Sequence, residues 1–562
     1  MKTLRIALAQ INPTVGDLKG NSEKIIEYIE KAGANDADIV VFPELAVTGY
    51  PPEDLLLDKS FLKDAMSRLD NIIAHTTDIV AIVGFADSTD KKLYNAAGII
   101  TNRTLIGTYR KINLTKSNVF DDSKYFKHGR NYPLYDLNGI GFYPVFFNDL
   151  KHLDNTGNLQ FNTSSSIILC MDASCYHTGK PAETEKAVSK IASRNGKYIA
   201  YLNMTGGQDE WVFEGGGFMA DTTGKIIAKS PVFEENLLLT DIKVKKNAPS
   251  HDYKIKRISI PSKLKEKELP VQSKIVNTPE PVEEVYRALV LGTKDYVKKN
   301  GFNKVVLGLS GGIDSALVAV IAVDALGGEN VAGVSMPTRF TSEESKADAR
   351  EIAKHLNIQF IEVPIDTLYD YYLNMCTSIF NNKPPSQLTQ ENIQPRIRAN
   401  ILMALSNNFG WLVLTTGNKS EVGSGYSTLY GDTAGGFALI KDVSKTRVYE
   451  LARWINKKAG QHLIPERILT KAPSAELKHN QKDTDTLPPY EVLDPIMKAY
   501  IKDNKTIEEI TVMGYSPELI TKIINIIQIN EYKRRQSPIG IKITKKSFGK
   551  DRNFPITNRY RF

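Results

Sequence analysis

Ser310-Gly311-Gly312-Ile313-Asp314-Ser315 lies between two apolar runs, Val305 to Leu309 before it and Ala316 to Val323 after it. The first run predicts a short buried strand, and the second predicts a helix. A glycine turn at such a junction presents free backbone N–H groups, and the start of the helix adds positive partial charge. We therefore expect a phosphate-binding turn inside an α/β domain.

The residues of this turn indicate which kind of phosphate-binding site it forms. It is not a Walker-type loop, because the Gly-Lys-Ser/Thr ending is absent. Gly311 and Gly312 let the backbone approach an anion closely, while Ser310 and Ser315 can donate hydrogen bonds. An acidic residue beside phosphates, Asp314, predicts a magnesium ion shared with them. Two glycines alone would fit an ordinary βα turn, but the complete six-residue pattern favours nucleotide binding.

Length and composition limit the class of protein. With 562 residues the chain is too long for one hydrophobic core, so at least two domains are expected. Hydrophobic residues make up 41% and charged residues 24%, which is ordinary for a soluble globular protein. The net charge of +8 suits small anionic ligands, and no basic stripe interleaved with aromatic residues indicates nucleic acid.

The sequence also indicates a compartment. Residues 1–9 predict a strand and not a signal peptide, and no apolar run approaches the length that spans a membrane. The cysteines are Cys170, Cys175 and Cys376, and their spacing fits neither a metal site nor a disulfide framework. We expect a cytoplasmic protein without a membrane partner.

Two α/β patterns are separated by a segment of different character. Residues 1–245 alternate strand-like and helical runs, and residues 246–280 are Lys-rich, contain proline and lack periodicity. Residues 281–562 begin with a helical run, Val282 to Leu289. The expected division is a domain over 1–245, a linker over 246–280 that wraps over a surface, and a domain over 281–562.

The second domain is predicted to contain a parallel sheet covered by helices on both faces. Its strand candidates are Val305–Leu309, Val331–Val334, Phe360–Val363 and Trp411–Thr416. Ligands of such sheets bind at the carboxyl ends of the strands. Thr416 to Glu421 follows the last strand there, and Glu391 to Arg398 is expected to open a helix.

Several segments of this half together resemble the N-type ATP pyrophosphatase family and, within it, the NAD synthetases. The matching segments are Leu307–Ser315, Asn392–Arg398, Thr416–Glu421, Gly431–Phe437, Lys471–Leu477, Leu487–Asp494 and Lys533–Pro538. The resemblance implies a Rossmann-like parallel α/β domain and a ligase of NAD biosynthesis. ATP would adenylate the nicotinate carboxylate of deamido-NAD with release of pyrophosphate, and ammonia would then displace AMP.

The resemblance also implies the site residues, ATP and Mg²⁺. ATP would be bound by Ser310, Gly311, Gly312, Asp314, Ser315 and Thr416, and magnesium by Asp314 and Glu421. Deamido-NAD would contact Asn392, Glu421 and Lys533. The family forms homo-oligomers in which synthetase domains pair, so a dimer or a larger assembly is expected.

The first half resembles the nitrilase, or carbon-nitrogen hydrolase, superfamily, whose domain releases ammonia from glutamine in bacterial glutamine-dependent NAD synthetases. The segments that carry the resemblance are Phe42–Leu45, Gly49–Leu55, Tyr109–Lys111, Val119–Asp121 with Tyr125–Phe126, and Gly206–Glu210 with Phe213–Gly216. An α-β-β-α sandwich is implied. Such an amidase needs a cysteine nucleophile, a glutamate for proton transfer and a lysine that stabilises the developing charge. Glu44 and Lys111 match the last two, and Ser174 and Lys180 match glutamine-binding positions.

The cysteine position holds Phe147 when residues are counted forward from Lys111 and backward from Asp172. Phenylalanine has no nucleophilic atom, so a vestigial glutaminase and direct use of ammonia are predicted. Ser117 and Lys151 also replace aromatic residues of the family pattern.

Other functions remain open at this point. A full glutamine-dependent enzyme could use a relocated cysteine, Cys170 or Cys175. The first domain could be a binding or assembly module, which is compatible with the leading hypothesis. A ligase that amidates a nucleotide base fits the glycine turn alone, and a free-standing nitrilase leaves half of the chain unexplained.

Overall fold

The computed structural model describes residues 2–89, 92–156, 165–244, 256–267 and 269–560. Their contacts form two compact units, one of Met1–Gln208 with Val212–Pro279 and the other of Asp209–Trp211 with Glu280–Phe562. Each unit is described by itself. Residues 246–255 of the expected linker, and residue 245 before it, lie outside the described residues.

Unit 1 contains two large sheets. Its first strands and helices are β1 (Lys2–Gln10), α1 (Leu18–Ala34), β2 (Ile39–Val41), α2 (Lys59–His75), β3 (Val80–Thr89), β4 (Lys92–Thr101), β5 (Thr104–Arg110), α3 (Asp122–Tyr125), β6 (Leu134–Leu137), β7 (Ile140–Phe146) and α4 (Phe147–Asn155). They are followed by β8 (Ser165–Asp172), α5 (Lys180–Asn195), β9 (Tyr198–Asn203), β10 (Thr205–Gln208), β11 (Trp211–Glu214), β12 (Phe218–Ala220), β13 (Ile226–Lys229), β14 (Asn236–Val244) and β15 (Arg257–Ser259).

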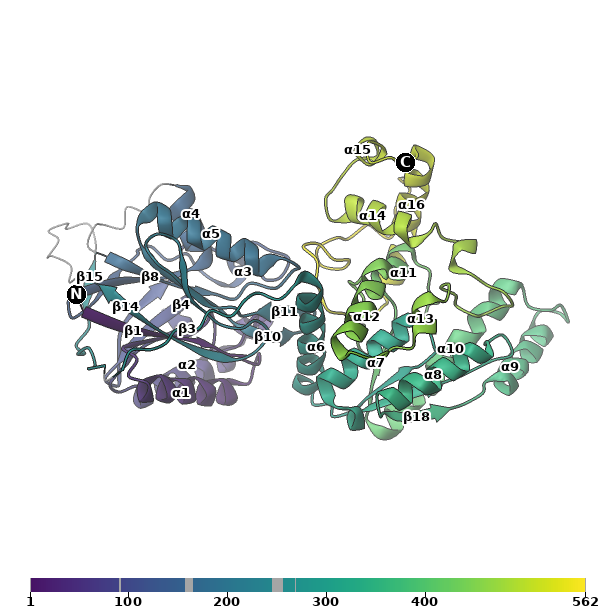
Figure 1. The fold of residues 1–562 in the computed structure, drawn as a ribbon, viewed down its shortest axis with the longest axis horizontal. Coiled ribbons are helices and arrows are strands. Elements are labelled where there is room, and N and C mark those ends of the chain that lie inside the picture. Colours follow the sequence, from purple (N-terminus) through teal and green to yellow (C-terminus); the bar gives the residue numbers. More distant parts are fainter. Residues whose placement is uncertain (1, 90–91, 157–164, 245–255, 268, 561–562) are drawn as a thin grey trace. The chain divides into compact units, whose positions relative to one another are not determined.

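The sheets pack face to face between helices. Among the described strands, one sheet has the order β14-β1-β2-β3-β4-β5 and the other β13-β12-β9-β8-β7-β6-β15. Helices α1 and α2 lie on one side of the two layers, and α4 and α5 lie on the other (Figure 1). This is the α-β-β-α sandwich that the sequence resemblance implied.

Successive side chains of a strand point to opposite faces of the sheet. Each strand therefore contributes residues both to the core between the two sheets and to the core under the helices. In β1, Leu4, Ile6 and Leu8 enter the core cluster that strands of both sheets share, whereas Ala7 and Ala9 join the cluster that contains residues of α1 and α2. In β8 the alternation has the same effect, since Leu169 faces the shared core and Cys170 packs with residues of α4 and α5.

The described part of the expected linker packs on unit 1. Strand β15 pairs in parallel with β6, and the ammonium of Lys267 lies 2.9 Å from a carboxylate oxygen of Asp38. The guanidinium of Arg5 donates to the backbone oxygen of Leu269 at 2.6 Å. These contacts agree with a segment that wraps over a surface.

Unit 2 contains a smaller sheet and many helices. Its first elements are α6 (Pro281–Lys299), β16 (Val305–Gly308), α7 (Ile313–Leu326), β17 (Val331–Ser335), α8 (Glu343–His355), β18 (Gln359–Glu362), α9 (Asp366–Ile379), α10 (Gln387–Phe409) and β19 (Leu412–Leu414). They are followed by α11 (Lys419–Ser424), α12 (Lys445–Ala459), α13 (Glu466–Thr470), α14 (Tyr490–Ile501), α15 (Ile507–Thr511), α16 (Pro517–Ile529) and α17 (Glu531–Arg534).

The sheet of unit 2 is parallel, as predicted, with the order β18-β17-β16-β19. The glycine turn connects the carboxyl end of β16 to the start of α7. Gly311 has φ +78°, and a Cβ atom there would lie 2.1 Å from the backbone oxygen of Ser345. Only glycine fits this position, because other residues would meet both a strained backbone and a steric clash.

One expected helix boundary was wrong. Residues 391–398 do not open a helix, because α10 begins at Gln387 and places Asn392 in its second turn. The side chain of Ser386 accepts a hydrogen bond from the backbone N–H of Thr389 at 3.3 Å and so caps the helix there. Pro395 lies inside the helix.

Candidate functional site

A cavity of about 560 Å³ opens at the carboxyl ends of β16 and β19 in unit 2. All predicted nucleotide-site and metal-site residues of this half line it: Ser310, Gly311, Gly312, Asp314, Ser315, Asn392, Thr416, Glu421 and Lys533. They come from segments that are up to about two hundred residues apart in the chain, and the parallel sheet brings their ends to one edge.

The hydroxyl groups of the glycine turn hold the turn together. Ser310 Oγ lies 3.1 Å from Ser315 Oγ and accepts a hydrogen bond from the backbone N–H of Gly312 at 3.2 Å. Ser315 Oγ donates to the backbone oxygen of Gly312 at 2.9 Å. The turn is therefore preorganised at the start of α7, where an anion is favoured.

Two carboxylates meet at a lysine that the sequence analysis did not find. The Lys445 ammonium forms ion pairs with Asp314 and with Glu421, the latter at 3.2 Å. Asn418 Nδ2 donates to the other oxygen of Asp314 at 3.0 Å, and Asn418 also caps α11. Lys445 belongs to none of the segments quoted above, and 131 residues separate it from Asp314.

Burial and ion pairing shift the pKa values of Glu421 and Lys445. Removal from water raises the pKa of Glu421 to about 8, with Asp314 adding to the shift and Lys445 opposing it. Burial alone would lower the pKa of Lys445, but the two carboxylates outweigh it and raise the pKa above the ordinary value. A cation between these carboxylates is therefore strongly favoured.

Other polar side chains line the remaining walls. Asn392 Oδ1 accepts from Thr428 Oγ1 at 2.6 Å, and Lys533 Nζ donates to the backbone oxygens of Gly425 and Ser427 at 2.7 and 2.8 Å. Desolvation lowers the pKa of Lys533, and Asp432 partly offsets this.

Two further charged side chains, Arg398 and Asp432, line the cavity. Arg398 Nε donates to the backbone oxygen of Met336 at 3.0 Å, and desolvation lowers the pKa of Arg398 to about 10. Asp432 lines the cavity, and desolvation raises its pKa to about 6, with the hydrogen bond from the backbone N–H of Thr428 opposing the shift.

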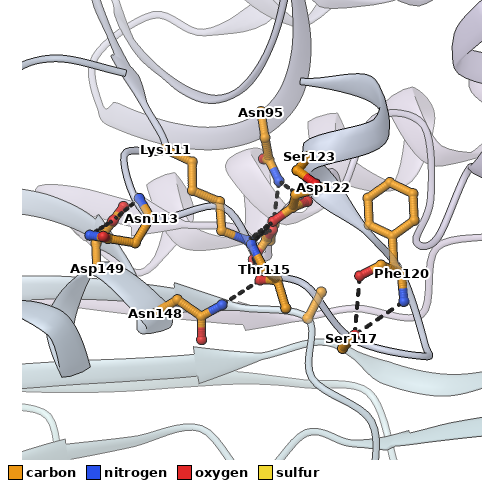
Figure 2. Close-up of polar contacts among 12 residues, drawn as sticks. Asn95, Lys111, Asn113, Thr115, Ser117, Phe120, Asp122, Ser123, Asn148 and Asp149 are labelled. Carbon is orange, nitrogen blue, oxygen red and sulfur yellow. Dashed lines mark hydrogen bonds and ion pairs between the residues drawn. The ribbon is translucent and has the colours of Figure 1, made fainter. Parts of the chain in front are cut away.

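A second polar cluster lies in unit 1 and joins the expected amidase residues (Figure 2). Lys111 Nζ lies 2.6 Å from Glu44 Oε1 and 2.8 Å from a carboxylate oxygen of Asp122. Asn95 Nδ2 donates to the same Glu44 oxygen at 2.6 Å. The sequence analysis named Glu44 and Lys111 and missed Asp122 and Asn95.

Burial of this cluster favours the neutral form of Glu44. Desolvation raises the pKa of Glu44 to about 7, with Lys111 opposing the shift and Asp122 and Asp172 adding to it. The pKa of Lys111 is lowered by burial but raised further by its two carboxylate partners, and the net direction is upward. Glu44 can therefore exchange a proton near neutral pH.

The end of β7 adjoins this cluster. The ring centroid of Phe146, the last residue of the strand, lies 5.5 Å from Lys111 Nζ. Asn148 donates to the hydroxyl of Thr115, which in turn accepts from Lys111 Nζ at 3.3 Å. Phe146 thus contacts Lys111 directly, and Asn148 contacts Thr115, which bonds to Lys111. Figure 2 shows the contact of Asn148.

Phe147 itself is the first residue of α4 and is buried in an apolar cluster. Its ring packs edge-on against Tyr201, with centroids 5.2 Å apart, and the ammonium of Lys151 lies 3.9 Å from the ring centroid. No atom of this side chain can attack a carbonyl carbon.

The two expected glutamine-binding residues are engaged by neighbours. Lys180 Nζ lies 2.6 Å from Glu214 Oε1 and donates to the backbone oxygen of Ser174 at 2.6 Å. The Ser174 hydroxyl donates to Asp172, which also accepts from Tyr201 at 2.6 Å. Asp172 is close enough to influence Glu44, so both groups belong to one region of unit 1.

The cysteines of this region differ in environment. Cys170 has no exposed surface and packs in the core, where burial raises the pKa of its thiol well above the ordinary value. A thiol held in its protonated form is a poor nucleophile. Cys175 is half-buried and follows Ser174.

The raised pKa of Glu44 predicts a pH effect on stability. Its folded pKa of about 7 exceeds the ordinary 4.5, so the stabilisation from the bound proton is complete below pH 4.5 and is lost as the pH rises to about 7. Glu44→Gln should therefore raise the stability of unit 1 at pH 8 by about 2 kcal/mol and change it little at pH 4.5. Thermal unfolding at both pH values measures this, with exposed Glu30→Gln on α1 as the control. Equal shifts at both pH values would contradict it.

Comparisons with known proteins define the class first. Residues 285–537 match the NAD synthase family, and residues 5–249 match the carbon-nitrogen hydrolase family. The chain is 44% identical over 578 residues to the glutamine-dependent NAD(+) synthetase of Thermotoga maritima, with 100% of both chains covered. It is 43% identical to that of Aquifex aeolicus, with 99% of this chain and 100% of the relative covered.

A solved structure supports the same class. The glutamine-dependent NAD+ synthetase of Acinetobacter baumannii, determined with adenosine diphosphate bound, aligns with a TM-score of 0.76 at 37% identity over 99% of both chains. The Cytophaga hutchinsonii enzyme, at 23% identity and a TM-score of 0.82 over 99% of this chain and 98% of that one, shows the shared fold alone.

The chain belongs to the family of glutamine-dependent NAD(+) synthetases. It is a ligase of NAD synthesis that forms a carbon–nitrogen bond, and ATP is a substrate. Among the described residues, no helix combines the length and apolar character needed to span a membrane.

Proposed function

We propose that unit 2 amidates deamido-NAD to NAD in two steps. The nicotinate carboxylate attacks the α-phosphorus of ATP and pyrophosphate leaves, and ammonia then attacks the adenylated carboxyl carbon and AMP leaves. The observation that carries this proposal is the convergence of the glycine turn and the Asp314–Lys445–Glu421 cluster in one cavity.

The chemistry of the cavity suits two anionic substrates. ATP and deamido-NAD repel each other, so bringing them together requires cations and N–H donors. The turn supplies N–H groups and the start of α7, while Arg398, Lys445 and Lys533 supply positive charge. Thr416 would contact ATP, and Asn392 and Glu421 would contact deamido-NAD, because all three line this cavity. Positioning the reacting atoms is then the main contribution of the protein.

The residues of this cluster fit Mg²⁺. Asp314 and Glu421 are hard oxygen donors that already share one cation, the Lys445 ammonium. Within the described ranges no group of three or more His, Cys, Asp or Glu side chains could hold a metal, so two carboxylates and substrate phosphates would complete the coordination. When bound, the ion neutralises charge on the phosphate groups.

We propose that ammonia is taken directly. Glu44 and Lys111 could still handle a proton and a developing charge, but the nucleophile position, Phe147, is packed against Tyr201. Ser174 and Lys180 already bond to Asp172 and Glu214, although the Lys180 ammonium keeps one N–H donor and the Ser174 hydroxyl can still accept. The glutaminase is thus vestigial, and the reaction belongs in the cytoplasm, where free cysteines stay reduced.

The test of the main proposal is pyrophosphate release. Protein incubated with ATP, Mg²⁺ and deamido-NAD should exchange labelled pyrophosphate into ATP without any nitrogen donor, and ammonium should then yield NAD. Omitting deamido-NAD is the control. Absence of both exchange and NAD with plentiful ammonium would disprove the assignment.

We also propose that unit 2 pairs with a second copy through α9. Five apolar residues form an exposed stripe at helical spacing on this helix: Leu368, Tyr371, Tyr372, Met375 and Ile379. Tyr371 is 70% and Ile379 66% exposed, which is unusual for such large side chains in a contiguous stripe. Helix α9 lies at the periphery of its unit (Figure 1), where another chain can reach it.

Charges placed in this stripe should separate the copies. Tyr371→Glu combined with Ile379→Glu should convert the assembly to monomers and weaken pairing by at least about 3 kcal/mol, because both carboxylates would be buried at the interface. Light scattering coupled to size exclusion measures the mass. Val512→Glu, at another exposed apolar position, is the matched control. An unchanged mass in the double variant would rule out this face.

A further inference from the structure

Asp494 is a buried carboxylate that the proposed two-step reaction does not use. It ends the segment Leu487–Asp494, which carried part of the sequence resemblance but supplied no expected site residue. In the structure Asp494 lies in the second turn of α14. Its side chain is buried and does not belong to the lining of the cavity of unit 2. A role in the reaction would therefore have to act through other residues.

The Asp494 carboxylate connects the starts of two other helices. Its Oδ1 accepts a hydrogen bond from the hydroxyl of Ser420 in the first turn of α11. Its Oδ2 accepts from the backbone N–H of Thr446 at 3.0 Å and from the Thr446 hydroxyl at 2.8 Å, at the start of α12. A carboxylate is favoured beside the free N–H groups of a helix start. Both carboxylate oxygens of Asp494 are thus engaged, one with each helix.

Ser420 extends this connection to the site. Its Oγ also accepts a hydrogen bond from the backbone N–H of Lys445 at 2.9 Å, and its side chain has no exposed surface. Ser420 directly precedes Glu421, whose carboxylate pairs with the Lys445 ammonium at 3.2 Å. The backbone segments that carry Glu421 and Lys445 are therefore joined by hydrogen bonds from residues that do not line the cavity.

Fixing these two backbone segments matters because the charged groups must meet the substrates in one arrangement. The lysine side chain is long and flexible, so the place of its ammonium depends on where its backbone is held. A displacement of about 1 Å at a reacting centre can cost a factor of about 10² in rate. Substrate binding tolerates such a displacement better than the transition state does.

We propose that Asp494 is a positioning residue for the adenylation step. Through Ser420 and the start of α12 it sets the separation of Glu421 and Lys445, and it contacts no substrate itself. Loss of its charge should therefore reduce turnover more than substrate binding. This inference rests on the proposed function of the cavity, in which Glu421 and Lys445 take part.

The kinetics of pyrophosphate exchange in Asp494→Asn test the proposal. Asparagine has the same shape, and its amide oxygen can still accept from Thr446, but its NH₂ group faces the Ser420 hydroxyl, which loses its acceptor. The kcat of exchange should fall about tenfold to a hundredfold, whereas the KM values for ATP and deamido-NAD stay within about threefold. The affinity for ATP measured by calorimetry should stay within the same range, because the cavity lining is intact.

Ser420→Ala cuts the same connection from the other helix and removes a single oxygen atom. Its kcat should fall to a similar extent, again with little change in the KM values. The double variant of Ser420→Ala with Asp494→Asn should lose no more than about twofold beyond either single variant, because both changes break one connection. Losses that multiply in the double variant would contradict a shared path.

Ile501→Val is the matched control for stability. Ile501 is the last residue of α14 and is buried in an apolar cluster, so this change should lower the thermal midpoint and leave kcat as in the wild type. An unchanged kcat in Asp494→Asn would overturn the inference. A loss of kcat matched by an equal loss of ATP affinity would overturn it too, since the role of Asp494 would then be purely structural. Absence of exchange in the wild type would defeat the proposed function, and this inference with it.

Discussion

NAD should form readily from ammonium chloride and at least about 10³-fold more slowly from glutamine, when ATP, Mg²⁺ and deamido-NAD are saturating. The physical reason is the proposed alignment of position 147 with the nucleophile, because the phenyl ring of Phe147 has no atom that could attack the amide carbon. Initial rates of NAD formation with each donor measure the effect directly.

Restoring the sulfur alone should achieve little. Phe147→Cys is expected to raise the glutamine-dependent rate by less than about tenfold, because the pocket around it has changed as well. Asn148 bonds to Thr115, and Lys180 is held by Glu214. Any thiol at position 147 would also replace a ring that packs against Tyr201.

The cysteine variants provide the decisive control. Cys170→Ala and Cys175→Ala should leave both donor rates unchanged. Glutamine turnover comparable with that of ammonium, and lost in either variant, would establish the alternative of a relocated nucleophile. Since the Cys170 thiol is buried and its pKa raised, Cys175 is the position to examine first.

The second large effect is expected from Asp314→Asn. This change should lower kcat/KM for pyrophosphate release by about 10² to 10³ and raise the Mg²⁺ concentration required for half-maximal rate. Asp314 accepts from the Lys445 ammonium and from Asn418 Nδ2. An amide in its place presents an NH₂ group to one of these donors, and it removes one of the two charges that attract the metal.

The Mg²⁺ dependence of pyrophosphate exchange distinguishes the loss of a metal ligand from a general loss of folded, active protein. Asp503→Asn, at an exposed position after α14, should behave as the wild type. An unaltered Mg²⁺ requirement in Asp314→Asn, with a reduced maximal rate, would remove Asp314 from the metal site and leave it a role in holding Lys445.

Much of the fold could be anticipated from local patterns. The apolar run from Val305 predicted β16, and the glycine turn predicted where α7 begins, because these features depend on neighbouring residues. The start of α10 was missed because the matched motif began inside the helix. Ser386, the residue that caps it, carried a local signal that was not used.

The candidate sites could be predicted only in part. Glu44, Lys111, Asp314 and Glu421 belong to recognisable segments, and the structure places each pair in a cluster. Asp122 and Lys445 had no such signal. Asp122 and Lys445 contribute to the clusters through ion pairs with residues on other segments of the chain. No local sequence pattern predicts such pairs.

The amino-acid sequence by itself predicted the two-part organisation, the parallel sheet of the second unit and the glycine turn between strand and helix, and it has phenylalanine at the position that the resemblance assigns to the nucleophile. These depend on side-chain periodicity, on the absence of a Cβ in glycine and on which atoms a residue carries. Only the tertiary structure decided that burial raises the pKa values of Glu44 and Glu421 and that Lys445 lies between two carboxylates. Desolvation and ion pairing depend on what the folded chain brings within a few ångströms, and that is set by packing across the whole unit.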